Sequence, residues 1–289
     1  MFFFHILDKK LLLIYLSFIL FIPQSFAENV RILGPRDNID PAHHFFISLI
    51  KSLLVESLYD DVQLVSGLRL SQARIFKHID NDIIDIVWSG TNIYREENYT
   101  PIRIPIFKGL LGHRFIIIHK DNLAKFEQIS KPEQLKKLIA CQGIHWPDSD
   151  ILEANGYIVN RVVHYEAMFK MILKKRCDYF PRAIYEAFSE RELLKKTNPE
   201  LIVYDKIMLQ YKLPVYFFVK KNNHALAEII ESNFIKYINN GEFTKSMNIS
   251  NLLPKNINWD KVNIFALENL QLPPKTPINN KLLWFKANN

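Results

Sequence analysis

The stretch IIDIVWSGTNIYR, residues 83–95, gives the strongest single indication of the fold. Residues 83–88 form an apolar run broken only by Asp85, which is typical of a strand buried on both faces of a parallel sheet. Small and polar residues follow at once, and open α/β sheets bind their ligands beyond the carboxyl ends of such strands. The stretch therefore predicts a central strand that leads into a ligand-binding turn.

Working outward from this strand, short apolar segments alternate with helical ones. Strands are expected at residues 30–33, 62–65, 115–118, 138–142, 158–163, 178–180 and 215–219. Helices between them are expected to begin at Asp40-Pro41, Ser71, Pro132 and Asp148, and an amphipathic helix is expected over 225–240. This alternation predicts an α/β fold of doubly wound type.

The first 27 residues resemble a secretory signal peptide. Lys9 and Lys10 precede a run of apolar residues over 11–22, Pro23 breaks any helix, and Ser25 and Ala27 form a small-x-small cleavage signal. The run is shorter than the ~20 apolar residues that a bilayer-spanning helix needs. We therefore expect cleavage after Ala27 and a periplasmic mature protein, with an uncleaved membrane anchor as the alternative.

The remaining 28–289 segment is long enough for two domains. Loss of Lys9, Lys10 and Asp8 with the peptide lowers the formal net charge from +7 to +6. The basic residues are scattered in short clusters, which is typical of solvated helix faces and turns, so nucleic acid is not expected as a partner. The two cysteines, Cys141 and Cys177, leave a disulfide and a pair of buried free thiols both open.

Four stretches, taken in order, resemble the family-three extracellular solute-binding proteins. The first is Asp85 to Thr91 with Arg95, a strand followed by a small-residue turn, a Thr and an Arg. The others are 105–118, 135–148 with its polar loop at a helix start, and 169–179; residues 240–243 are similar to the family's closing Gly-x-aromatic pattern. The turn from Gly90 to Arg95 is about one residue shorter than in many amino-acid-binding members, which puts a ligand inferred from them in doubt.

The resemblance implies the type II periplasmic binding protein-like fold, in which two doubly wound α/β lobes are joined by two crossover segments. Lobe one is expected to comprise 28–112 plus 214–289, and lobe two 113–213. The implied function is capture of a small polar, anionic, amino-acid-like solute between the lobes. A membrane permease of an ABC importer or a sensor kinase would then recognise the closed protein, which we expect to be a monomer.

Six residues at predicted strand ends and helix starts are candidate ligand contacts. Thr91 and Arg95 follow the buried strand and match the residue types with which the family binds ligand anions, and Arg can donate two parallel hydrogen bonds to a carboxylate. His145, Trp146 and Asp148 lie on a loop before a helix, where free N–H groups favour anions. Arg182 follows a buried strand and Pro181. Arg36 and Arg74 are weaker candidates by the same argument.

Each candidate also has a purely structural interpretation. Arg95 would be a surface residue, Trp146 would pin its loop, and Asp148 would act as a helix N-cap. No catalytic residues, metal or cofactor are expected, because the sequence has no GxSxG elbow, HExxH motif or glycine-rich phosphate loop. A secreted hydrolase on the same fold and a non-binding interaction module with a filled cleft are the alternatives to a solute-binding protein.

Overall fold

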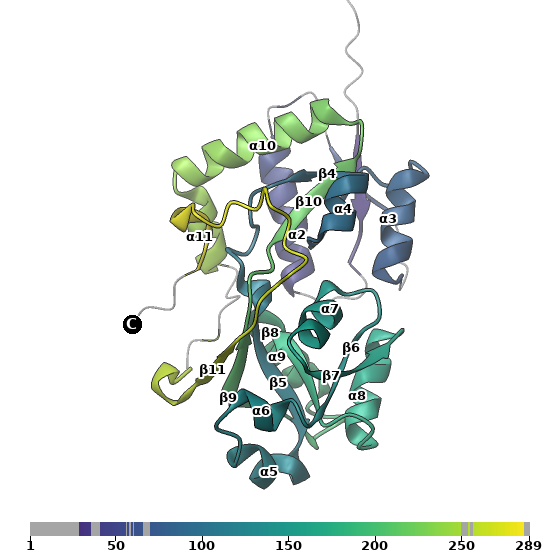
Figure 1. The fold of residues 1–289 in the computed structure, drawn as a ribbon. Coiled ribbons are helices and arrows are strands. Elements are labelled where there is room, and N and C mark those ends of the chain that lie inside the picture. Colours follow the sequence, from purple (N-terminus) through teal and green to yellow (C-terminus); the bar gives the residue numbers. More distant parts are fainter. Residues whose placement is uncertain are drawn as a thin grey trace, which may run out of the picture.

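A computed structural model describes residues 29–35, 41–55, 57, 59, 61–65, 70–249, 254 and 257–285. Two mixed sheets with interleaved helices lie one above the other in Figure 1, each at the centre of one lobe. The proposed signal peptide and Arg36 lie outside the described residues.

The first sheet has the strand order β2-β1-β3-β10-β4. Its strands are β1 (Val30–Leu33), β2 (Val62–Val65), β3 (Ile86–Gly90), β4 (Tyr99–Ile102) and β10 (Val215–Lys220). Strand β1 runs parallel to both β2 and β3, whereas β10 is antiparallel to both β3 and β4.

The second sheet has the strand order β11-β9-β5-β8-β6-β7. Its strands are β5 (His113–His119), β6 (Ile139–Gly143), β7 (Ile158–Val162), β8 (Tyr179–Ala183), β9 (Leu201–Gln210) and β11 (Asn263–Ala266). Strand β6 is parallel to β7 and β8, and β5 is antiparallel to β8 and β9.

Helices connect these strands. In the first lobe they are α2 (Pro41–Leu54), α3 (Gln72–Asp80), α4 (Ile93–Asn98), α10 (His224–Asn239) and α11 (Glu242–Ile249). In the second they are α5 (Leu123–Glu127), α6 (Pro132–Leu135), α7 (Pro147–Ala154), α8 (Tyr165–Leu173) and α9 (Ile184–Leu194). Elsewhere along the chain, short 3-10 turns lie at Leu110–Gly112, Lys120–Asn122, Trp259–Lys261 and Lys281–Leu283. Helix α2 has one apolar face that includes Ile50 and Leu53, both 1% exposed or less, and it packs against α10.

The α/β prediction is confirmed, and the first two strands have the predicted bounds. Two of the boundaries that differ affect candidate site residues. Strand β8 continues through Pro181 and Arg182, so Arg182 lies within the strand and not after it. Helix α7 begins at Pro147 with Trp146 as its N-cap, so Asp148 is not the cap that the sequence suggested. Pro147 is favoured at the first helical position because its fixed φ suits a helix start.

The C-terminal part departs from the expected division, in which all of 214–289 belongs to lobe one. Strand β11 instead pairs in parallel with β9, from Asn263 beside Ile207 to Ala266 beside Gln210. Phe265 and Leu267 are buried in the core of the second lobe. The chain therefore enters the second sheet again after α11, and the yellow segment of Figure 1 then leads from β11 back to the first lobe.

Two crossovers, residues 103–112 and 211–214, join the sheets and lie side by side, since the Tyr211 N–H donates to the Gly112 carbonyl at 2.9 Å. The hydrophobic core of the first lobe continues across them. Phe107 of the first crossover is 0% exposed, with ring centroids 5.2 Å from Phe45 of α2 and 4.4 Å from Tyr185 of α9. The region between the lobes is thus a packed interior as well as a hinge.

Cys141 of β6 and Cys177, just before β8, form a disulfide with their Cα atoms 5.6 Å apart. The register explains it: Ala140 pairs with Tyr179, which brings the residue after Ala140 close to the turn before β8. The sequence left a disulfide and two free thiols both open, and the structure has the disulfide. A disulfide is typical of proteins that leave the reducing cytosol.

We expect the Cys141→Ala/Cys177→Ala double variant to lose about 3–4 kcal/mol of unfolding free energy, because the bridge closes a loop over a sequence separation of 36 residues in the unfolded chain. Urea unfolding of the oxidised protein and the variant measures the difference. A reductant should destabilise the wild type and leave the variant unchanged. Equal stability of the two proteins would contradict the disulfide.

Candidate functional site

Several strands of the second sheet end or begin at one edge, and this edge gathers the charged side chains. Arg114 near the start of β5 pairs with Ala183 at the end of β8, and His113 pairs with Gln210 at the end of β9. Because β6 runs parallel to β8, its last residue, Gly143, lies at the same edge. The helices that follow β6 and β8, namely α7 and α9, therefore present their first turns here.

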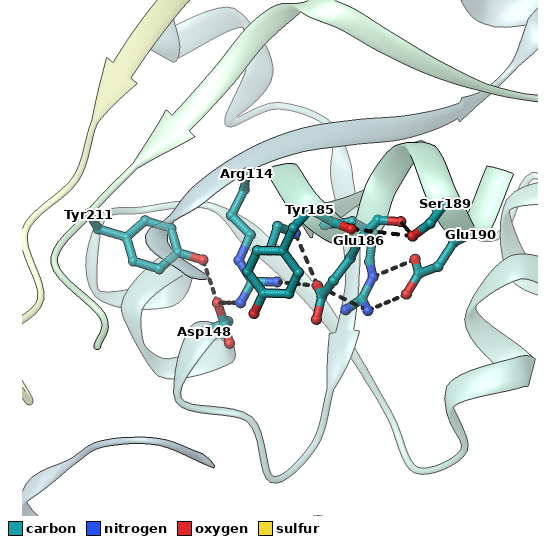
Figure 2. A network of polar contacts seen from close by, with 9 residues as sticks. Arg114, Asp148, Tyr185, Glu186, Ser189, Glu190 and Tyr211 are labelled. Atoms are coloured by element: carbon teal, nitrogen blue, oxygen red, sulfur yellow. Dashed lines mark hydrogen bonds and ion pairs between the residues drawn. The ribbon is translucent and has the colours of Figure 1, made fainter. Parts of the chain in front are cut away.

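Arg114 and Asp148 form a buried ion pair at this edge. The Arg114 Nη2 atom lies 2.5 Å from Asp148 Oδ1, and both side chains are at most 4% exposed. The Tyr211 hydroxyl donates to the same oxygen at 2.5 Å (Figure 2). Burial acts to lower the pKa of Arg114, but Asp148, Tyr211 and Glu186 together outweigh it and raise the pKa, so the guanidinium stays charged.

Arg182 forms a second buried cluster with two glutamates of α9. Its Nε atom donates to Glu190 at 2.7 Å, its Nη2 atom also donates to Glu190, and Nη2 lies 3.0 Å from Glu186 Oε2. The same Glu186 oxygen is 3.6 Å from Arg114 Nη1, so Glu186 lies between the two guanidiniums. Burial raises the pKa of Glu190 above its usual range, although Arg182 opposes this shift.

Trp146 closes one side of this network. The Arg182 guanidinium lies 5.2 Å from the Trp146 ring centroid, and the ring stacks at 6.3 Å on Phe180. A Cβ on Gly143 would lie 2.5 Å from the indole, so the ring can pack there only because residue 143 is glycine. Trp146 is thus held against the second lobe and remains half-buried.

Arg95 of α4 is the candidate that differs from the others. It is 6% exposed and forms no ion pair with a carboxylate of the described residues. Its Nη1 donates to Ser89 Oγ at 2.9 Å and to the Gly90 carbonyl, and its Nη2 donates to Gln72 Oε1 at 2.7 Å and to the His145 carbonyl at 3.2 Å. Burial lowers the pKa of Arg95 to about 10, and Asp148 and Asp150 oppose this shift.

The bond from Arg95 to His145 joins the two lobes, because α4 follows β3 of the first sheet and His145 follows β6 of the second. Thr91 is completely buried and donates its hydroxyl to Glu96 Oε1 at 2.9 Å. The His145 side chain is exposed, so it is the carbonyl that meets Arg95. Arg74 is exposed on α3.

The sequence analysis did not identify four residues of the network: Arg114, Glu186, Glu190 and Tyr211. Glu186 and Glu190 are spaced so that they lie on one face of α9, four residues apart, with Arg182 four residues before Glu186. That spacing is visible in the sequence and was a usable signal. The pairing of Arg114 with Asp148 joins residues 34 apart and carries no local signal.

The part of the chain that the structure describes lacks two further classes of feature. No group of three or more His, Cys, Asp or Glu side chains there is arranged to hold a metal ion. Over the same residues, none of the helices combines the length and apolar character needed to span a bilayer.

The fold and the position of these residues define the class. The chain has the type II periplasmic binding protein-like fold, with polar side chains gathered at facing edges of its two sheets. No family model matches the chain, and no curated protein matches it significantly.

Three solved structures are similar in fold. An ancestral arginine-binding protein bound to arginine shows 17% identity and a TM-score of 0.56 over 77% of this chain and 98% of its own. A Salmonella typhimurium periplasmic binding protein of high arginine specificity shows 15% identity and a TM-score of 0.56 over 77% and 99%. A histidine kinase sensor domain similar to periplasmic binding proteins shows 11% identity and a TM-score of 0.55 over 77% and 93%.

The buried ion pair leads to a stability prediction. We expect Asp148→Asn to lower the free energy of unfolding by about 3 kcal/mol, because it leaves the Arg114 charge buried without its closest carboxylate. Asp150→Asn is the matched control: it lies in the same first turn of α7, but its side chain is 48% exposed. We expect that control to change stability by less than about 1 kcal/mol. Denaturant unfolding distinguishes the two, and equal effects would contradict the role of Asp148.

Proposed function

We propose that this protein is an exported solute-binding protein that captures a small anionic, amino-acid-like solute between its two lobes. The observation that carries the proposal is the state of Arg95. Arg114 and Arg182 already face carboxylates, whereas Arg95 is a buried cation that donates only to neutral oxygens among the described residues. A buried charge without a counter-ion is costly, and a ligand carboxylate or phosphate would offset that cost.

The position of Arg95 supports the same proposal. It lies on the first turn after β3, at the carboxyl end of a central strand, where α/β sheets bind ligands. Its longest hydrogen bond, 3.2 Å to the His145 carbonyl, comes from the opposite lobe. A solute anion that took over the Nη2 donor would exchange this contact for a charge-assisted one, which is about twice as strong as a neutral hydrogen bond.

The second lobe offers the complementary charge. Its buried network holds two guanidiniums, Arg114 and Arg182, against three carboxylates, Asp148, Glu186 and Glu190. Among the described residues, Glu186 contacts Arg114, Arg182 and the Ala183 N–H through Oε2, and its side chain is 21% exposed, so Oε1 is the acceptor that remains. An ammonium group on the solute would satisfy that oxygen, and we propose a zwitterionic solute for this reason.

Export and a membrane partner complete the proposal. The N-terminal signal pattern and the disulfide both suit an oxidising compartment, and mass spectrometry of the exported protein should find an N-terminus at Glu28.

The partner that recognises the closed lobes is a permease or a membrane sensor. Most similar structures are binding proteins, which supports binding over catalysis. Loss of solute uptake, with signalling intact, in a strain lacking the protein identifies the permease.

The first test is a thermal-shift screen of the purified protein against amino acids, organic acids, sugars and phosphates. A solute that binds only the folded state raises apparent stability by ~2.7 kcal/mol at a hundredfold excess over its Kd. We expect a hit to weaken by about 10- to 100-fold in Arg95→Ala, because a hydrogen bond to a charged group contributes roughly 1.5–3 kcal/mol. Isothermal titration calorimetry measures the change.

Arg176→Ala is the control, since Arg176 is an exposed arginine of the second lobe. It should bind like the wild type. A well-folded wild type that responds to no compound would refute solute capture and favour the non-binding interaction module. Equal weakening by Arg95→Ala and Arg176→Ala would show that general charge, and not the Arg95 site, attracts the solute.

The zwitterion is tested separately with two related solutes: the amino acid found in the screen and its analogue without the amino group. We expect the wild type to prefer the amino acid and Glu186→Gln to reduce that preference by about tenfold or more, because the variant lacks the carboxylate charge that attracts an ammonium group. Titration calorimetry gives both affinities for each protein. An unchanged preference would assign the amino group to another acceptor.

A further inference from the structure

The C-terminal segment 263–285, called the strap below, has one end fixed in the second lobe. Its strand β11 pairs with β9, and the Leu267 N–H donates to Gln210 at 2.8 Å. Asn155, the C-cap of α7, donates to the Glu268 carbonyl at 2.7 Å and accepts from the Glu268 N–H at 3.1 Å. These bonds make the start of the strap part of the second sheet.

The other end of the strap is fixed at the hinge, in the core of the first lobe. Leu283 and Trp284 are 9% and 8% exposed and belong to the core that contains Phe107 and Leu110. The Phe285 N–H donates to the Lys108 carbonyl at 2.7 Å. Between the two ends, Asn269 donates to the Lys212 carbonyl at 2.9 Å, so the strap also touches the second crossover.

Trp284 contacts both crossovers at once. Its ring lies where a Cβ on Gly109 would be, 2.3 Å from the nearest ring carbon, so only glycine allows this approach. On the second crossover, the Lys212 ammonium lies 4.5 Å from the indole centroid. The indole N–H donates to the Pro277 carbonyl at 2.9 Å, which fixes the ring to the strap itself.

The first crossover has an unusual backbone at this point. The consecutive residues Lys108 and Gly109 have positive φ angles, 49° and 76°. Glycine adopts such angles readily, whereas lysine rarely does. A non-glycine residue with positive φ is held there by its surroundings, and such positions occur at hinges and switch regions. Trp284 and the bond from Phe285 to Lys108 are the surroundings that the strap supplies.

We propose that the strap controls lobe opening by wedging Trp284 between the two crossovers, so that the hinge favours the arrangement in which Arg95 reaches His145. The length of the strap does not itself restrain the lobes, because the 16 residues that follow Leu267 up to Leu283 could span up to ~50 Å when extended. The strap acts by packing at the hinge.

The test measures lobe opening directly in the whole protein without solute, so it does not depend on the proposed function. Spin labels on ketone-bearing residues at 77 and 170, both exposed, report the distance between α3 and α8 while leaving the disulfide intact. We expect Trp284→Ala to lengthen and broaden this distance distribution. We also expect amide exchange of residues 103–112 to quicken by about tenfold or more, as packing over the hinge is lost.

Leu282→Ala is the matched control, because Leu282 lies two residues away in the strap and is 77% exposed. It should match the wild type, and Trp284→Phe should restore part of the wild-type behaviour. If Trp284→Ala does not fold, Lys212→Met tests the same contact with the core intact and should quicken exchange in 103–112 alone. Unchanged distances and exchange in the folded variants, or equal changes in Leu282→Ala, would overturn the proposal.

Discussion

The buried pair of Arg114 and Asp148 is the interaction on which the second lobe depends. A guanidinium that is 1% exposed must face a carboxylate or be very costly, and the first turn of α7 supplies the nearer of the two carboxylates that Arg114 meets at this edge of the sheet. The requirement fixes α7 against β5, while Glu186 and Arg182 fix α9 in the same way on its other side. The polar network thus orients the two helices whose first turns face the first lobe. Buried ion pairs contribute little net stability, so its main effect is on geometry.

The charged partners of each buried arginine also distinguish Arg95 from Arg182, although the two residues have similar positions in the sequence pattern. Arg95 and Arg182 both follow strands predicted from the sequence, and both are nearly inaccessible in the structure, at 6% and 5% exposed. Arg182 already has Glu186 and Glu190 as counter-ions, so an anionic solute would have to compete with two carboxylates for it. Arg95 has only neutral oxygens. The absence of a counter-ion among the described residues is therefore the reason that we propose Arg95, and not Arg182, as the anion contact.

Local sequence patterns predicted the elements with strong apolar periodicity and missed the others for physical reasons. Strands β1 and β2 have the expected bounds because each is a run of four mostly apolar residues. The sequence pattern changes clearly after each run. Strand β4 contains Pro101, which argues against a strand, and β9 is interrupted by Asp205 and Lys206. Strand β11 lies in an Asn- and Pro-rich tail and is stabilised only by β9. The same limit applies to the candidate site: the sequence can nominate single residues at strand ends, but their partners are set by tertiary packing.

Hinge packing and solute affinity are linked through the population of the closed form. A binding protein whose competent form is only partly populated has its affinity reduced by that fraction, so a device that favours closure raises affinity without touching the solute. Under the proposed function, closure also makes entry harder, because the His145 carbonyl of the opposite lobe already accepts a hydrogen bond from Arg95. A hinge held by packing of a single indole is a compromise between these demands, since one side chain biases the equilibrium by a few kcal/mol at most and leaves both forms accessible. A strand paired with both sheets at the same place would have locked the lobes, and residues 267–283 of the strap form no strand.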